Sequence, residues 1–255
     1  MSKKQNLILL YGEKGEFFLV KPEKKRLNTN RGFLELQELS SKDYGDKITT
    51  STGYTFYIIK PTIEDVVMKG VKRFTQIIYP KDASLIVMKA GIGSGSRIIE
   101  VGGGSGAFTI VLASVVKPKG KVYTYEKRKE FIEKAKRNVE EAGLSKYVEF
   151  KHKEVKNKFD EKNVDFIMLD LPTPWELINA VKESLSPGRK CACILPTINQ
   201  VENFVFSLKK EGFIDIRTYE CWVREILVRE GKTRPQQLMP SHTGYLVFAT
   251  KIKAL

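Results

Sequence analysis

An apolar run that enters a glycine-rich turn constrains the fold of this chain more than any other feature. Residues 97–101 (Arg-Ile-Ile-Glu-Val) lead directly into residues 102–106 (Gly-Gly-Gly-Ser-Gly), and residues 121–126 form a second apolar run that ends in Glu126. A strand, a glycine turn, a helix and a second strand ending in a carboxylate are typical of the first half of a nucleoside-binding α/β fold. The pattern therefore favours an enzyme over a pure binding module.

Strands and helices alternate along most of the chain. Further strands are predicted at residues 147–151, 164–170 and 190–195, and helices near 82–90, 105–116, 128–142, 174–185 and 199–210. Such alternation predicts an α/β fold with a mainly parallel sheet and helices on both faces. Two late apolar runs, 213–223 and 245–251, have no long helix between them and predict a terminal antiparallel hairpin.

The first 61 residues have a different pattern. Short β-rich runs lie at residues 7–10, 17–20, 33–36 and 54–59, with turn-rich pieces between them. They predict a small β-rich N-terminal domain over residues 1–61, which Pro61 closes. Thr62, with Asp65 three residues later, has the pattern of a helix cap. A second, larger domain is therefore expected over residues 62–255.

The charge of the chain points to a polyanionic partner. The net charge is +14, and residues 66–120 carry eight Lys or Arg against two acids, Asp82 and Glu100. Such a field attracts RNA, although a solvated basic surface is the alternative explanation. No run of 18 apolar residues predicts a membrane span, and the apolar start at residues 7–10 is too short for a signal peptide. We therefore expect a cytoplasmic protein.

The cysteines and histidines give little support to a metal site. Cys191 and Cys193 alternate within an apolar run and are expected to be small core residues on one face of a strand, while Cys221 has no partner in the sequence pattern. The two histidines, His152 and His242, lie far apart, and no Cys-x-x-Cys occurs. Neither a disulfide framework nor a metal is predicted.

The glycine turn and Glu126 favour one class of cofactor. Glycines let backbone N–H groups approach a ligand, and a carboxylate at the end of the next strand can accept hydrogen bonds from two ribose hydroxyls. A dinucleotide site would need Gly-x-Gly-x-x-Gly, and the third glycine is displaced here. S-adenosylmethionine, which has a ribose but no pyrophosphate, fits better. The alternative is a glycine turn without a ligand.

The predicted strand 164–170 ends in a second candidate feature, Asp170-Leu-Pro-Thr-Pro-Trp175. A carboxylate followed by two prolines and an aromatic forms a rigid mouth suited to holding a flat ring, because proline fixes φ and removes a backbone donor. The alternative is that Asp170 caps the following helix. Its expected position beside the glycine turn favours a site.

These residues resemble the tRNA (adenine-N1)-methyltransferases that act on adenine 58 of the T-loop, in their single-gene archaeal and bacterial form. The resemblance covers nearly the whole chain and rests on Gln76-Ile-Ile-Tyr-Pro-Lys-Asp-Ala83, Glu100-Val-Gly-Gly-Gly-Ser-Gly106, Tyr125-Glu126, Arg137-Asn138, Asp170-Leu-Pro-Thr-Pro-Trp175, Pro196-Thr-Ile-Asn-Gln200 and His242-Thr-Gly-Tyr245. It implies a Rossmann-like class I methyltransferase with a seven-stranded sheet, tRNA as partner, and a homotetramer. Some archaeal members also methylate adenine 57.

The resemblance also implies roles for individual residues. S-adenosylmethionine, with S-adenosylhomocysteine as product, would be bound by Gln76, Glu100, Gly102, Gly103, Gly104, Ser105, Gly106, Phe108, Thr109, Glu126, Lys127, Arg128, Glu154 and Asp170. The target base would contact Tyr79, Pro172, Trp175, Asn199, Gln200, His242 and Tyr245. The family usually has Gly-Thr-Gly-Ser-Gly at the turn, and the Asp that often binds the cofactor adenine is replaced by residues 151–155, where Glu154 or His152 could serve.

Asp170 and Tyr79 are the expected catalytic residues. Asp170 would accept a hydrogen bond from the adenine amine, and Tyr79 would stack on a flipped-out base. Lying over the methionine part of the cofactor, or in the core, is the alternative for Tyr79. Charge alone suggests phosphate contacts for Arg224, Lys72, Arg73 and Lys81. Rival functions are a small-molecule or protein carboxyl methyltransferase, and a non-catalytic tRNA-binding subunit.

Overall fold

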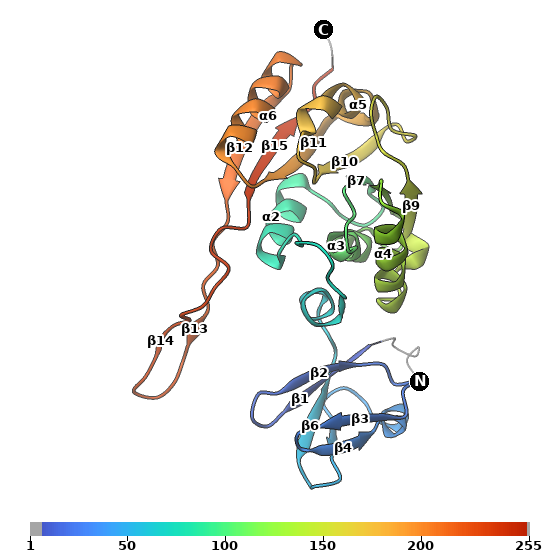
Figure 1. Ribbon diagram of the computed structural model, residues 1–255, viewed down its shortest axis with the longest axis vertical. Coiled ribbons are helices and arrows are strands. Elements are labelled where there is room, and N and C mark those ends of the chain that lie inside the picture. The colour runs from blue at the N-terminus through green and yellow to red at the C-terminus, as the bar shows by residue number, and fades with distance from the viewer. Residues whose placement is uncertain (1–6, 254–255) are drawn as a thin grey trace.

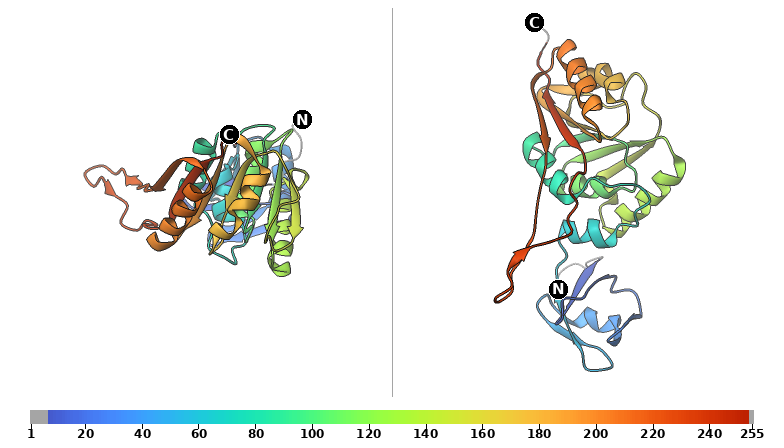
Figure 2. Two further views of the ribbon diagram at one scale, coloured as in Figure 1. Left: turned by 90° about the horizontal axis from the view of Figure 1, so that it is seen from above. Right: turned by 60° about the vertical axis from the view of Figure 1, so that its left-hand side comes forward.

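The computed structural model describes residues 7–253. Within them the chain forms a small β structure, a large α/β structure and a projecting arm, which we define as residues 221–244 (Figure 1). The small β structure and the arm extend from the same end of the large one (Figure 1 and Figure 2).

A seven-stranded sheet with the order β12-β15-β11-β10-β7-β8-β9 forms the centre of the large structure. The strands span Arg97–Val101 (β7), Lys121–Glu126 (β8), Val148–His152 (β9), Val164–Leu169 (β10), Leu185–Leu195 (β11), Ile214–Glu220 (β12) and Tyr245–Thr250 (β15). Neighbours from β11 to β9 pair in parallel, and β15 pairs antiparallel with both β11 and β12. The predicted mainly parallel sheet is confirmed, as is the antiparallel pairing of the two late strands.

Helices cover both faces of this sheet. They span Pro80–Ala90 (α2), Ala107–Val116 (α3), Lys129–Glu141 (α4), Ile178–Ser184 (α5) and Ile198–Lys210 (α6), with a 3-10 turn at Pro174–Leu177 (η4) before α5. Side chains of α2, α3 and α4 pack on one face, and those of α5 and α6 pack on the other. Successive residues of β7 point to opposite faces, as in any strand: Ile98 lies in the first core and Ile99 in the second.

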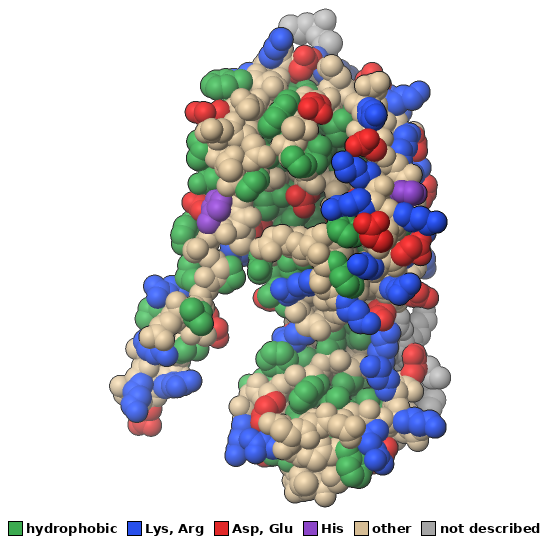
Figure 3. Space-filling view, viewed as in Figure 1, with side chains coloured by type: hydrophobic (Ala, Val, Ile, Leu, Met, Phe, Trp, Pro, Cys, Tyr) green, Lys and Arg blue, Asp and Glu red, His purple; other side chains and the backbone are tan. Residues whose placement is uncertain are grey.

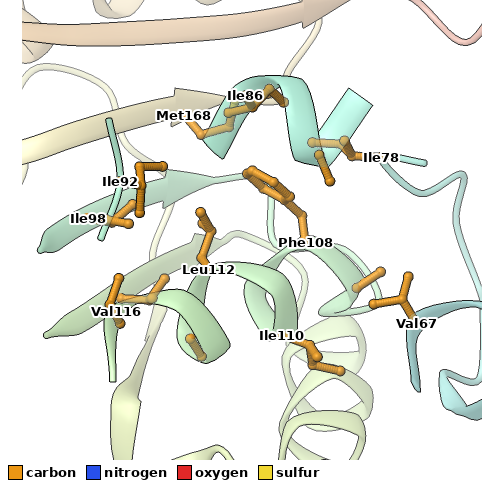
Figure 4. Close-up of a cluster of buried hydrophobic side chains, with 14 of the residues drawn as sticks. Val67, Ile78, Ile86, Ile92, Ile98, Phe108, Ile110, Leu112, Val116 and Met168 are labelled. Atoms are coloured by element: carbon orange, nitrogen blue, oxygen red, sulfur yellow. The ribbon is translucent and has the colours of Figure 1, made fainter. Parts of the chain in front are cut away.

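The first of these cores lies directly behind the glycine turn. Phe108 and Leu112 of α3 face Ile98 of β7, Met168 of β10 and Ile86 of α2 (Figure 4). All five are buried. The second core holds Cys191 and Cys193, which confirms their predicted role as small core residues. Two apolar layers thus hold the carboxyl ends of β7 and β10 in place.

The small β structure has a core of its own. A four-stranded antiparallel sheet has the order β2-β1-β6-β5, and β3 pairs with β4 beside it. The elements span Ile8–Gly12 (β1), Phe17–Val20 (β2), Arg26–Thr29 (β3), Gly32–Glu35 (β4), Lys47–Thr49 (β5) and Thr55–Ile59 (β6), with a 3-10 helix at Leu36–Ser41 (η1). The sequence patterns did not predict β3 and β5, because these short strands lack alternating apolar residues.

Thr62 begins the connection to the large structure. Its hydroxyl accepts the N–H of Asp65 at 3.1 Å, and the Asp65 carboxylate accepts the N–H of Thr62 at 3.0 Å, which confirms the predicted cap. A short helix (α1, Ile63–Asp65) and a π-helix (η2, Val66–Gly70) follow. The next helix, α2, begins at Pro80 rather than at residue 82, because proline suits the first helical position.

The arm is the one large element that the sequence patterns did not predict. The expected strand 213–223 ends at Glu220, and the chain then runs out to a two-stranded tip, Ile226–Leu227 (β13) and Arg234–Pro235 (β14), before it returns to β15. Figure 1 shows the arm extending well beyond the sheet. None of the helices in residues 7–253 is long and apolar enough to cross a membrane.

Candidate functional site

A cavity of about 200 Å³ opens where β7 and β10 end. Its lining consists of the loop residues Thr75, Gln76, Ile77 and Ile78, the strand-end residues Glu100 and Asp170, the turn residues Gly102, Gly103, Gly104 and Ser105, and Ala107, Phe108 and Arg128. Eight residues predicted to bind the cofactor are thus brought together with Asp170. The cavity lies at the carboxyl edge of the parallel strands, where open α/β sheets bind ligands.

Close approach of two backbones brings Asp170 to the glycine turn. The N–H of Asp170 donates to the carbonyl of Val101 at 2.9 Å, and the N–H of Gly102 donates to the carbonyl of Tyr125 at 2.9 Å. Gly102 has φ +91°, and a Cβ at this position would lie 2.1 Å from the carbonyl oxygen of Asp170. A side chain at residue 102 would therefore push Asp170 away from the cavity.

Glu126 lies nearly buried at the end of β8, and four nitrogen donors converge on it. Its carboxylate accepts the backbone N–H of Gly104 at 3.3 Å, the backbone N–H of Arg128 at 3.0 Å, and the Nε and Nη2 of the Arg128 guanidinium at 3.0 and 3.4 Å. Burial raises the pKa of Glu126, but the hydrogen bonds and charge of Arg128 outweigh it, so the pKa lies below its ordinary value. Glu126 is therefore an ionised acceptor beside the turn.

Glu100 forms a buried floor under the cavity. It is 2% exposed and accepts the hydroxyls of Thr109 at 2.6 Å and Thr124 at 2.8 Å. Burial raises the pKa of Glu100 to about 7; the two hydroxyls oppose this shift, and the charges of Asp170 and Glu126 add to it. Thr109 is itself fully buried and does not line the cavity. It contributes to the site only by its hydrogen bond to Glu100.

Asp170 is the most exposed of the three carboxylates Glu100, Glu126 and Asp170, and it lines the cavity. The side chain of Asp170 is exposed, yet desolvation by the protein around it, together with the negative charge of Glu126, raises the pKa of Asp170 to about 6. The alternative role as a helix cap is wrong. The N-cap of the following turn η4 is Thr173, and no side-chain hydrogen bond caps it.

The predicted base-contacting residues lie in loops and near the first residues of η4, α6 and β15, at the edge of the sheet where β10 and β11 end. The side-chain amide of Gln200 donates to the carbonyl of Pro172 at 3.1 Å and so ties the start of α6 to the loop after Asp170. The imidazole of His242 contacts the Glu220 carboxylate at 2.7 Å and lies 4.7 Å from the Tyr245 ring, centre to centre. Tyr79 and Trp175 are half-buried, each against one of the two cores, and Asn199 is exposed.

Lys127 and Glu154 pair with each other on the surface, 3.3 Å apart. His152 contacts the backbone carbonyl of Lys127 at 3.1 Å. These three side chains therefore lie beside the end of β8 and do not line the cavity.

Lys81 does not contact phosphate in this arrangement, contrary to the prediction. Its ammonium lies 2.9 Å from the Asp82 carboxylate, 2.7 Å from the Cys221 carbonyl and 2.5 Å from the Thr243 hydroxyl, and only 9% of its side chain is exposed. Asp82 is fully buried. Lys81 and Asp82 therefore anchor both ends of the arm to α2. The N–H groups of the Lys81 ammonium all donate to groups within the protein.

Four cavity residues were not assigned a role from the sequence: Thr75, Ile77, Ile78 and Ala107, the last of which directly follows the glycine turn. The two isoleucines fall inside the motif at residues 76–83, which was the available signal, whereas nothing local marks Thr75. Within residues 7–253, no group of three or more His, Cys, Asp or Glu side chains is placed to hold a metal ion.

The chain is similar to a family of RNA-modifying enzymes and to their structures. A family profile described as "tRNA methyltransferase complex GCD14 subunit" matches residues 53–233. A Methanocaldococcus jannaschii protein named tRNA (adenine(57)-N(1)/adenine(58)-N(1))-methyltransferase TrmI is 36% identical, over 94% of this chain and 93% of its own. A Thermus thermophilus tRNA (adenine(58)-N(1))-methyltransferase TrmI is 31% identical over 97% of both chains.

Two solved structures share the whole architecture. The structure of tRNA (m1A58) methyltransferase TrmI from Aquifex aeolicus has a TM-score of 0.83 at 32% identity and covers 100% of both chains. A Thermotoga maritima structure titled SAM-dependent O-methyltransferase has a TM-score of 0.90 at 40% identity and covers 100% of this chain and 96% of its own. Together with the cavity at the glycine turn, these matches place the chain in the tRNA (adenine-N1)-methyltransferase family of S-adenosylmethionine-dependent enzymes.

Proposed function

We propose that this protein transfers a methyl group from S-adenosylmethionine to N1 of adenine 58 in the T-loop of tRNA, and to adenine 57 where the tRNA has one. The observation that carries the proposal is the position of Asp170, whose carboxyl faces the cavity because Gly102 allows the two backbones to meet. The relatives named for this activity match nearly the whole chain, so the proposal is not built on the glycine turn alone.

The residues of the cavity fit S-adenosylmethionine. Gly102, Gly103 and Gly104 have no side chains to obstruct the cavity, and the ionised Glu126 beside them suits the two ribose hydroxyls. Gln76, Glu100, Phe108 and Arg128 complete the lining on the cofactor side. When bound, the cofactor supplies an electrophilic methyl group on a sulfonium.

Asp170 would act by electrostatics rather than as a base. Neutral adenine has a lone pair on N1, so catalysis consists mainly of aligning N1 with the methyl group and stabilising the charge that develops on the ring. An anionic Asp170 can accept a hydrogen bond from the exocyclic amine and stabilise that positive charge. Guanine presents a carbonyl at the equivalent position, which a carboxylate repels, so the same group favours adenine.

The target base would have to leave the folded tRNA, because N1 lies on its Watson–Crick edge. We propose that Tyr79 stacks on the flipped base, and that Pro172, Trp175, His242 and Tyr245 form the neighbouring surface. The hydrogen bond from Gln200 to the Pro172 carbonyl supports this assignment, because it holds the loop after Asp170 in position. Asn199 is the residue before Gln200 on α6 and is exposed.

A methyl-transfer assay on unmodified tRNA, followed by nucleoside mass spectrometry, tests the proposal. The expected product is 1-methyladenosine at adenine 58, with adenine 57 read separately by fragment mapping. The rival function is methyl transfer to an oxygen atom, because the similar Thermotoga maritima structure is described as an O-methyltransferase. Methylation of an oxygen acceptor without any 1-methyladenosine would favour that rival, and tRNA binding without transfer would favour a non-catalytic subunit.

The pH dependence follows from the raised pKa of Asp170. Because this pKa is about 6, the carboxyl is protonated below that pH and anionic above it. We expect kcat/KM for tRNA methylation to rise with pH through about 6 and to level off above it, since only the anion accepts the amine hydrogen bond. Glu100, with a pKa of about 7, titrates nearby, so the profile is repeated with Glu100→Gln. A wild-type profile that stays flat between roughly pH 5 and pH 8 would contradict the role of Asp170.

We also propose that the protein is a homotetramer, as its resemblance implies, and that the arm mediates self-association. Five large hydrophobic side chains of the arm are exposed: Trp222, Val223, Ile226, Val228 and Leu238. An isolated two-stranded hairpin is only marginally stable in water, and exposed apolar patches mark interaction sites. Figure 3 shows green apolar and blue basic side chains together on the arm.

The double substitution Val228→Asp and Leu238→Lys is expected to reduce the assembly to smaller species. Both side chains are more than three-quarters exposed, at 80% and 88%, so charged replacements should leave the fold of one chain intact while opposing an apolar contact. Light scattering coupled to size-exclusion chromatography measures the mass. Phe206→Asp, on α6 and 63% exposed, is the matched control. An unchanged mass in the double variant would remove the arm from the interface.

The division into domains is part of the same proposal. A separate apolar core supports a domain over residues 1–61, and the seven-stranded sheet with its two cores supports a methyltransferase domain over residues 62–255. The net charge of +14 supports tRNA as the partner, and a cytoplasmic location goes with that partner.

A further inference from the structure

A buried asparagine on α4 joins two separate walls of the cavity. The side-chain amide of Asn138 donates to the carbonyl of Lys72 at 3.2 Å and to the carbonyl of Ser105 at 2.9 Å, and its oxygen accepts the N–H of Lys72 at 3.3 Å. The residue is 5% exposed. Both amide hydrogens and the carbonyl oxygen are thus engaged with backbone groups.

The segment that Asn138 holds is the lid-like wall of the cavity. We define the flap as residues 71–78, which run from the end of η2 toward α2 and include the lining residues Thr75 to Ile78. Lys72 lies at its start. Thr75 lies directly over the glycine turn, because a Cβ at Gly104 would be 2.9 Å from its hydroxyl. The bonds to Lys72 therefore fix the flap near the point where it crosses the turn.

Helix α4 also packs directly against the glycine turn. Ala135 lies one helical turn before Asn138 on the same face, and a Cβ at Gly106 would be 3.1 Å from its Cβ. One face of α4 therefore contacts the glycine turn through Ala135 and joins it to the flap through Asn138. These contacts lie far from Asp170 in the chain and involve none of its atoms.

We propose that Asn138 is a positioning residue that holds the flap against the glycine turn and so sets the affinity of the cavity for S-adenosylmethionine. Without the Asn138 amide, the Lys72 and Ser105 carbonyls lose their hydrogen-bond donor. Opening the flap lets water donate to these carbonyls instead, so the free energy of opening falls. Cofactor binding then has to close the flap, and the apparent affinity falls by the fraction of closed molecules. The inference rests on the proposed function only in taking S-adenosylmethionine as the ligand.

Binding of S-adenosylhomocysteine, measured by calorimetry without tRNA, tests the proposal. We expect Asn138→Ala and Asn138→Asp to weaken binding about tenfold, because both remove the two donors. Asn138→Asp keeps the size of the side chain and one acceptor. At saturating cofactor, kcat and the KM for tRNA should stay within about threefold of wild type, because closing the flap restores the site. Lys136→Ala, an exposed residue of the same helix, is the control and should bind as wild type does.

Hydrogen exchange supplies a readout that does not depend on either variant's activity. In wild type without ligand, the Lys72 amide should be protected, and in both variants it should exchange faster and regain protection with saturating S-adenosylhomocysteine. Unchanged affinity in both variants, or a fall in kcat with KM for the cofactor unchanged, would overturn the proposal, as would an unprotected Lys72 amide in wild type. Wild type that fails to bind S-adenosylhomocysteine would instead reject the proposed function.

Discussion

Replacing Asp170 with alanine is expected to lower kcat for tRNA methylation by about 10²-fold or more, the usual cost of losing one preorganised electrostatic partner in the transition state. The expectation follows from the position of the carboxyl at the cavity, beside the turn, with a pKa of about 6 that leaves it anionic at neutral pH. Binding of S-adenosylhomocysteine should change much less than kcat, because the main role proposed for Asp170 is its contact with the base, although it also lines the cofactor cavity.

Asp170→Asn separates charge from shape, since it keeps the size of the side chain. It should lose nearly as much activity as alanine, because an amide NH₂ facing the adenine amine is repulsive and its oxygen carries no full charge. Glu176→Gln is the matched control, because Glu176 is an exposed carboxylate six residues further along the chain, in η4. Initial rates with saturating cofactor and tRNA measure the effect, and an undiminished rate in either Asp170 variant would show that the carboxylate does not act on the base.

Gly102→Ala is expected to abolish both cofactor binding and methyl transfer. The added Cβ would lie 2.1 Å from the Asp170 carbonyl oxygen, a backbone atom, and the residue would keep a φ of +91°. Neither the turn nor the end of β10 can yield without moving the cavity wall. We expect at least about a 10²-fold loss of activity, since small misplacements of catalytic groups have effects of this size.

Gly95→Ala is the matched control, because it separates backbone strain from the clash. Gly95 has a similar φ, +89°, but a Cβ there would meet nothing within 4 Å. Its alanine variant should lose about 1–3 kcal/mol of unfolding free energy from the positive φ alone and still bind S-adenosylhomocysteine as wild type does. Calorimetric titration measures cofactor binding by both variants, and thermal unfolding measures their stability. Equal binding by Gly102→Ala and wild type would show that the turn does not form the cofactor site.

Local patterns were sufficient to predict the elements that carry the cavity. The apolar run at residues 97–101 and its glycines became β7 and its turn, and the expected strand 164–170 became β10 with Asp170 at its end. The cap at Thr62 was also predicted, because a capping box depends on residues only three apart. The boundaries were less accurate: α2 begins two residues before the predicted start.

Other parts of the site could not be predicted, because their partners are distant in the sequence. Lys81 looked like a phosphate ligand, and only its contacts with Cys221 and Thr243, 140 and 162 residues away, show that its charge is used inside the protein. Asn138 was part of the resemblance through the pair Arg137-Asn138 but was assigned no role, and only the structure shows that it joins Lys72, 66 residues earlier, to the turn. The arm has short strands with no periodic pattern.

The sequence by itself determined the alternation of strands and helices in the large sheet, the glycine turn and the carboxylates at the strand ends, because apolar periodicity and turn residues act over a few neighbouring positions. The tertiary structure alone decided that the flap closes over the turn, that Lys81 is withdrawn from the surface, and that the arm stands away from the sheet. Those outcomes depend on packing and hydrogen bonds between segments that meet only after the sheet has formed, and no local pattern encodes them.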